Sequence, residues 1–166
     1  MKKNSDELLL WNCAAKAYAA SQDDSEFSKL NKDIVCSRFP CFHGESVLDL
    51  GCGPGWYTEY FRSHGAHAIG CDGSEAMITE ARNAYPLCRF DSAILGEPLP
   101  YKNSSFHMVF CNQVLMDIEN LSESFSEIAR ISVRITLRSS FRSDKIALYS
   151  RILISSSWNS FSSFAR

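Results

Sequence analysis

The sequence predicts an α/β fold, a three-layer sandwich in which helices cover both faces of a mainly parallel sheet. Short apolar runs alternate along the chain with segments of helical periodicity, which is the order of βαβ units. Three closely spaced glycines separate the first apolar run from the helix after it, at the edge where open parallel sheets bind ligands. The 166 residues, 45% of them hydrophobic, suffice for one such domain.

Two helices are expected before the first strand. A Ser or Asn at positions 4–5 can cap a helix whose apolar residues fall roughly on one face. These residues are Leu8, Leu9, Trp11, Ala15, Tyr18 and Ala19. A polar break over 21–25 leads to a second helix, which runs from Glu26 towards Phe39 and ends before Pro40.

Four strands and three helices are expected to alternate after that. The first strand, 46–50, is an apolar run that the glycines close. The other strands are expected at 66–71, 87–90 and 106–111. The helices are expected at 57–64, 75–84 and 121–131, with stop signals at Gly65 and Pro86 after the first two.

The composition divides the chain near residue 131. Residues 1–131 hold 11 Lys and Arg against 18 Asp and Glu, a net charge of −7, whereas 132–166 hold 6 against 1, a net charge of +5. The second segment has 11 Ser and no Gly or Pro. We therefore expect a domain over 1–131, with helices over 5–40 and a core over 44–131, followed by an atypical Ser/Arg-rich tail over 132–166 with one strand between Lys145 and Ser155.

The sequence gives no sign of secretion, a membrane span or a metal site. Its apolar runs are too short for a signal peptide or a membrane helix, so a cytoplasmic protein is expected. Seven cysteines at irregular spacing contain no C-x-x-C pair, which favours buried reduced thiols over a disulfide framework or zinc. The four histidines lack ligand spacing and are expected at the surface or at strand ends.

The strongest pattern is a strand, then G-x-G-x-G over 51–55, then a helix. Glycines permit the tight turn and let a ligand lie against bare backbone. Asp72 stands at the expected end of the second strand, Asp91 at that of the third, and Asn112 follows the fourth. Because the carboxyl ends of parallel strands meet at one edge, these residues should converge around the loop, where Asp72 can accept both hydroxyls of a ribose.

Two classes of cofactor could use this edge. A dinucleotide site calls for G-x-G-x-x-G or G-x-G-x-x-A, so that the helix N-terminus can meet the pyrophosphate. The bulky Trp56 occupies the position of the third small residue. The spacing therefore favours a nucleoside-like ligand without pyrophosphate.

Several ordered motifs resemble those of class I S-adenosylmethionine-dependent methyltransferases, in their type 11 or small-molecule branch. The glycine motif at 47–55 resembles the first motif of that family, and 70–77 resembles the second-strand motif. The adenine-enclosing segment matches at 90–93, and the fourth strand and its helix match at 113–118 and 127–130. The resemblance covers about residues 8–131 and implies a Rossmann-like fold, S-adenosylmethionine as cofactor and a small-molecule acceptor.

The resemblance also implies contacts with the methionine portion of the donor. Gly51, Gly53 and Gly55 would pass along it, and the Asn112 backbone would contact its amino group. Asp49 would hold the loop or that amino group, although it could equally cap the loop amides.

A second group of implied contacts surrounds the nucleoside. Asp72 would take the ribose hydroxyls, and Gly73 and Met77 would lie against the adenine. Asp91 would accept a hydrogen bond from the adenine amino group, with the Ser92 amide beside it.

The N-terminal helix resembles the lid of that branch. Tyr18 would close over the donor, although Trp11 and Tyr18 could equally be core packing. His107 departs from the family pattern, which has Asp at that place. Cys52 and Cys111 flank the expected site, where small buried residues are a better account than a reactive nucleophile.

The expected function is methyl transfer from S-adenosylmethionine by in-line displacement. No general base, and hence no catalytic residue, is identifiable from the sequence. One alternative is a truncated donor-binding fragment without catalysis, and another is an NAD-dependent oxidoreductase, which Trp56 disfavours. The acceptor and the oligomeric state do not follow from the sequence.

The tail departs from the family after Ile131. The resemblance calls for a Leu-x-Pro-Gly-Gly turn and three further strands, so the C-terminal part of the sheet is expected to be incomplete. Translation in another frame would explain the Ser/Arg richness, and resequencing the gene around codon 131 tests this. Serines rather than aromatic residues separate the arginines, which disfavours nucleic-acid binding.

Overall fold

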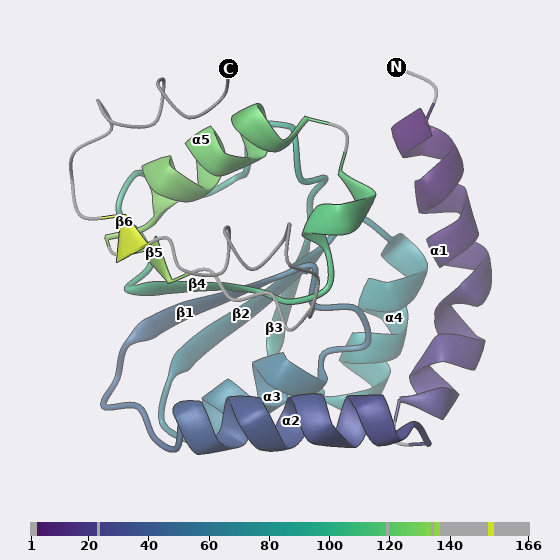
Figure 1. Cartoon of the computed structure of the whole chain (residues 1–166), viewed down its shortest axis with the longest axis horizontal. Coiled ribbons are helices and arrows are strands. Elements are labelled where there is room, and N and C mark those ends of the chain that lie inside the picture. Colours follow the sequence, from purple (N-terminus) through teal and green to yellow (C-terminus); the bar gives the residue numbers. More distant parts are fainter. Residues whose placement is uncertain (1–2, 23, 119, 134, 137–152, 155–166) are drawn as a thin grey trace.

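A computed structural model describes residues 3–22, 24–118, 120–133, 135–136 and 153–154. Its centre is a parallel sheet in the order β3-β2-β1-β4 (Figure 1). The strands are β1 (Ser46–Leu50), β2 (His67–Asp72), β3 (Arg89–Ser92) and β4 (Met108–Cys111). The helices are α1 (Lys3–Ser21), α2 (Glu26–Arg38), α3 (Trp56–Ser63), α4 (Glu75–Ala84) and α5 (Leu121–Ile131), with a short 3-10 helix η1 (Leu115–Asp117). The predicted parallel α/β sheet is confirmed.

Alternation along β1 and β4 divides their side chains between two faces of the sheet. Val47 and Phe110 join an apolar cluster with Phe61 of α3 and Val35 of α2. The intervening strand residues join a second cluster with α5. These are Leu48, Leu50, Val109 and Cys111, and they pack with Ile128 and Ile131. Because successive strand residues point to opposite faces, the two clusters form the two apolar layers of a three-layer sandwich.

Two strands begin two residues later than the sequence predicted. The third was expected over 87–90, but β3 starts at Arg89, because Pro86 and the 78% exposed Leu87 belong to the turn after α4. The fourth was expected from 106, but β4 starts at Met108, since Phe106 makes an isolated bridge with Ser132. The first shift places Asp91 inside its strand rather than at the end of it.

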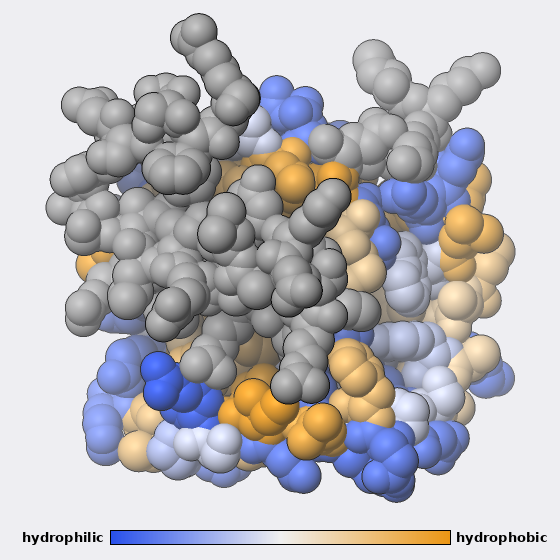
Figure 2. Space-filling model, in the orientation of Figure 1, coloured by the Kyte–Doolittle hydropathy of each residue, from blue (hydrophilic) through white to orange (hydrophobic). Residues whose placement is uncertain are grey.

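Helix α1 lies along α4 (Figure 1). Asn12 Oδ1 accepts hydrogen bonds from Ser74 Oγ at 2.7 Å and from the Ala76 amide at 3.2 Å. Ala15 is buried, whereas Leu9 is 60% exposed. Leu9, which was expected to lie roughly on one face with the other five apolar residues, therefore lies outside the buried face, and hydrophobic side chains reach the surface in this part of the molecule (Figure 2).

The tail contributes two short antiparallel strands, β5 (Ile135–Thr136) and β6 (Leu153–Ile154). Residues 134, 137–152 and 155–166 of the tail lie outside the described residues, and with them most of the strand expected between Lys145 and Ser155. Within the described part of the chain, no helix is both long and apolar enough to cross a membrane.

Candidate cofactor site

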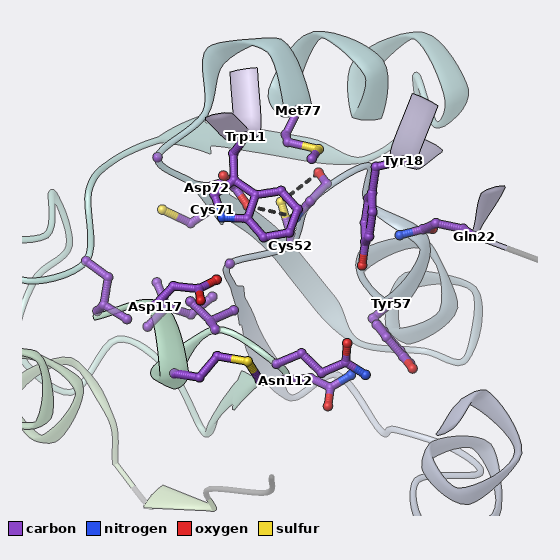
Figure 3. A pocket seen from close by; sticks show the side chains of 18 of the residues that line it. Trp11, Tyr18, Gln22, Cys52, Tyr57, Cys71, Asp72, Met77, Asn112 and Asp117 are labelled. Atoms are coloured by element: carbon purple, nitrogen blue, oxygen red, sulfur yellow. Dashed lines mark hydrogen bonds between the residues drawn. The ribbon is translucent and has the colours of Figure 1, made fainter. Parts of the chain in front are cut away.

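A cavity of about 630 Å³ opens at the carboxyl ends of β1, β2 and β4 and extends to α1 and α2 (Figure 3). This volume falls within the range of roughly 300–1,000 Å³ that is usual for small-molecule sites. Most residues that the sequence predicted for the site line it. These are Tyr18, Gly51, Gly53, Asp72, Gly73, Met77 and Asn112. The remaining four, Asp49, Gly55, Asp91 and Ser92, do not line it.

The glycine loop is held by the end of β2. The amides of Gly51 and Cys52 both donate to the Cys71 carbonyl, at 2.7 and 3.0 Å. Gly51 has a φ of +74°, and a Cβ there would lie 2.1 Å from Cγ2 of Val114. Both the backbone conformation and the close approach therefore require glycine at this position.

Gly55 serves packing rather than the cavity. It precedes α3 with a φ of +88°, and a Cβ there would lie 2.7 Å from the Phe90 ring. Because the ring occupies this space, Gly55 lets the start of α3 approach β3.

Asp72 braces the loop from the end of β2. Its Oδ2 accepts from the Gly53 amide at 2.9 Å, and its Oδ1 accepts from the Ser74 amide at 2.8 Å. Burial raises the pKa of this carboxyl above its usual value, while the backbone amides oppose the shift. Each carboxylate oxygen has a second lone pair, so Asp72 can hold the loop and still accept hydrogen bonds from hydroxyls in the cavity.

Asp49 lies in β1, 2% exposed and outside the cavity. Its Oδ2 accepts a hydrogen bond from Thr58 Oγ1 of α3 at 2.7 Å. Burial raises the pKa of this carboxyl to about 7, and the Asp72 charge adds to the shift. Asp49 therefore ties β1 to α3 beneath the loop.

Asp91 is paired outside the cavity. Its carboxylate accepts from Arg89 at 3.1 and 2.9 Å and from the Tyr101 hydroxyl at 3.2 Å. Because Asp91 lies inside β3, its side chain shares a face with Arg89, two residues earlier. Ser92, at the end of β3, is exposed, and Ala93 and Ile94 line the cavity instead.

Trp11 and Tyr18 of α1 line the cavity and pack edge to face, with ring centroids 5.6 Å apart. Their exposed fractions are 37% and 38%. A Cβ on Gly53 would lie 3.9 Å from the Tyr18 ring. These positions place Tyr18 over the glycine loop and at the cavity wall rather than in the core.

The cavity also contains residues that sequence reasoning missed. Asn31 of α2 and Glu7 of α1 each line it with a buried oxygen, Oδ1 and Oε2, that has no hydrogen-bond partner among the described residues. Tyr57 and Asp117 line it as well. In the sequence, only Asn31 could have indicated this part of the cavity, because it is a polar residue four positions before Val35 on the inner face of a helix.

The two cysteines that line the cavity, Cys52 and Cys71, are protonated thiols. Burial is the main cause that raises the pKa of Cys71 to about 11 and that of Cys52 above its ordinary value. Both side chains line the cavity, but neither is poised as a thiolate. Among the described residues, no group of three or more His, Cys, Asp or Glu could hold a metal ion.

The comparison with protein families decides the classification. The model described as "Methyltransferase domain" matches residues 48–133, which run from β1 past the end of α5. The chain belongs to this family.

Curated relatives and solved structures agree with the family match. The chain is 30% identical over 89 residues to malonyl-[acyl-carrier protein] O-methyltransferase of Erwinia billingiae, covering 54% of this chain and 35% of that one. It is 34% identical over 99 residues to trans-aconitate 2-methyltransferase of Escherichia coli, covering 58% and 38%. The structure of an S-adenosylmethionine-dependent methyltransferase from Mesorhizobium loti aligns with a TM-score of 0.56 at 27% identity, covering 63% and 51%. The chain thus spans about a third to a half of the length of the curated relatives it matches.

Proposed function

We propose that this methyltransferase-family protein binds S-adenosylmethionine in the cavity and methylates a small-molecule acceptor. The observation that carries the proposal is Asp72, which is fixed by the glycine loop and by Ser74 and still has lone pairs for ribose hydroxyls. The names of the relatives, two of which specify small carboxylic acids or their acyl derivatives, support a small-molecule acceptor.

The residues of the cavity fit such a donor. Gly51 and Gly53 offer bare backbone to its methionine portion, beside the Asn112 backbone. Gly73 and Met77 would pack against the adenine. Tyr18, above Gly53, would close over the bound donor.

The four predicted residues outside the cavity take supporting roles in this proposal. Asp49 and Gly55 hold α3 and the loop in place. For Asp91 to reach the adenine amino group, as the resemblance implies, its carboxylate would exchange its bonds with Arg89 and Tyr101, and Ser92 would move with it.

The bound sulfonium supplies an activated methyl group, so the protein mainly needs to position the acceptor. An acceptor lone pair held in line with the methyl group would take it in a single displacement, and the sulfonium sulfur would leave with the electrons of the carbon–sulfur bond. A proton on the acceptor is released to water. Holding the two reactants in line is worth on the order of 7–11 kcal/mol of the barrier.

The test is Asp72→Asn, which keeps the shape of the side chain but removes its charge. We expect about a 10- to 100-fold weaker affinity for S-adenosylhomocysteine by calorimetry, because charge-assisted hydrogen bonds contribute about 1.5–3 kcal/mol each. The exposed Asp33→Asn on α2 is the matched control. Unchanged affinity in a folded Asp72→Asn protein would contradict the ribose role, and donor binding without transfer to any acceptor would favour a binding function alone.

A further inference from the structure

Asn31 is buried at the cavity wall with an unused hydrogen-bonding group. The residue is 5% exposed and lines the cavity from α2. Its Oδ1 has no partner within the part of the chain that the structure describes. Val35, four residues later on the same helix face, packs into the apolar cluster of Phe61 and Phe110. Asn31 thus stands where that cluster gives way to the cavity.

A buried amide without a partner destabilises a protein, whereas an apolar residue of similar size would not. The Ser28 hydroxyl, three residues earlier on the same helix, accepts a hydrogen bond from Ser25 Oγ at 2.8 Å and makes none to Asn31 Oδ1. A group that enters the cavity is the natural partner for the Asn31 oxygen.

The other residues that line the cavity indicate what that group is. Tyr18, Gln22 and Tyr57 gather at one side of the cavity, away from Asp117 (Figure 3). They offer hydroxyl and amide groups, and burial raises the pKa of Tyr57, which keeps its hydroxyl protonated. The charged residues that line the cavity, within the described ranges, are mainly acidic. They are Glu7, Asp24, Asp72 and Asp117, against Lys32, whose ammonium lies 4.3 Å from the Trp56 ring centre.

We propose that Asn31 Oδ1 accepts a hydrogen bond from a hydroxyl or amino group of the methyl acceptor, and that the acceptor is not a carboxylate. This inference rests on the proposed function, since it assigns the acceptor part of the same cavity. A carboxylate has no proton to give, so it would leave Oδ1 unpartnered and add negative charge to an acidic cavity. The acceptor class therefore differs from what the names of the relatives suggest.

The first test uses Asn31→Leu in the free protein, with the exposed Asn83→Leu of α4 as control. Removing an unpartnered buried group should raise the melting temperature by about 2–4 °C. For a chain of this length, a gain of about 1 kcal/mol in the free energy of unfolding corresponds to a shift of that size. The control should leave the melting temperature unchanged. A lower melting temperature for Asn31→Leu would show that the amide is already satisfied in the free protein, and would overturn the proposal.

The second test measures acceptor class with the probes phenol and benzoate, which share a ring and differ in the polar group. The protein is first saturated with S-adenosylhomocysteine, and each probe is titrated by calorimetry up to about 10 mM. We expect phenol to bind at least about tenfold more tightly than benzoate, and Asn31→Leu to lose that preference while its affinity for S-adenosylhomocysteine stays within about twofold. Equal affinities, a preference for benzoate, or no phenol binding would overturn the inference. Failure of the wild type to bind S-adenosylhomocysteine would instead overturn the proposed function.

Discussion

The two ends of the cavity differ in how their polar groups are satisfied. At the glycine-loop end, the amides of Gly51, Cys52 and Gly53 are bonded to the end of β2, and Asp72 has a partner on each oxygen. At the α2 end, the buried Asn31 oxygen has no partner among the described residues. The polar groups of the first end are bonded before any ligand binds, whereas a ligand would supply the missing partner at the second end. In the proposed function, the first end would bind the methyl donor and the second end would bind the methyl acceptor.

The largest expected effect breaks the organised end. Gly51→Ala should lower the free energy of unfolding by about 5 kcal/mol, because left-handed strain of about 1–3 kcal/mol adds to overpacking against Val114. Gly44→Ala is the matched control, since Gly44 also has a positive φ, of +87°, but a Cβ there would lie 3.8 Å from the nearest atom, Nε2 of His67. Gly44→Ala should lower the free energy of unfolding by about 1–2 kcal/mol. Equal losses in denaturant unfolding would show that Val114 does not constrain the loop, and adding Val114→Ala should recover part of the Gly51→Ala loss.

The second prediction concerns Asp49, beneath the same end. Its pKa of about 7 in the folded protein lies above the ordinary 3.8, so the folded state keeps a proton that the unfolded state loses. Stability should therefore fall as pH rises from about 4 to 7, and this group should contribute about 4 kcal/mol to the fall. Asp49→Asn should remove that contribution in denaturant unfolding at pH 4 and pH 8. Thr58→Val, which removes the hydroxyl bonded to the carboxylate, should steepen the fall, and identical pH profiles for Asp49→Asn and wild type would refute the assignment.

A smaller effect is expected where α1 is fixed to the organised end. Asn12→Leu removes two hydrogen bonds to the start of α4 and should lower the free energy of unfolding by about 2 kcal/mol. Since α1 also carries Trp11 and Tyr18, affinity for S-adenosylhomocysteine should fall with it. The exposed Lys16→Leu on the same helix should change neither quantity. A stable Asn12→Leu protein with full affinity would show that α1 needs no such anchor.

The smallest effect is expected at Asp91. Its carboxylate is paired with Arg89 and Tyr101 outside the cavity, so Asp91→Asn should weaken S-adenosylhomocysteine binding by about threefold or less. Calorimetry measures this directly beside Asp72→Asn. A loss of tenfold or more would show that Asp91 leaves those partners and reaches the adenine.

The organised end could be predicted from the sequence because its geometry is local. Glycines set the turn, and period-two alternation sets the strand edges, so Asp72 falls at the ligand edge without knowledge of other elements. Asp91 was placed less well because the turn after Pro86 delays β3 by two residues, which changes where the side chain stands in its strand.

The α2 end could not be predicted in the same way. Asn31 lies on α2, whose position over the sheet depends on tertiary contacts such as the bonds that the Tyr60 hydroxyl donates to the carbonyls of Cys36 and Phe39. No spacing within α1 or α2 reveals which face meets the cavity. The sequence shows only that Asn31 precedes Val35 by one helical turn.

Calorimetric titration of the protein with S-adenosylmethionine, S-adenosylhomocysteine and NAD distinguishes a methyl-donor site from a dinucleotide site. We expect saturable binding of the first two at one site per chain and none of NAD, because the bulky Trp56 stands where a dinucleotide site calls for a small residue. Saturable binding of NAD alone would contradict it.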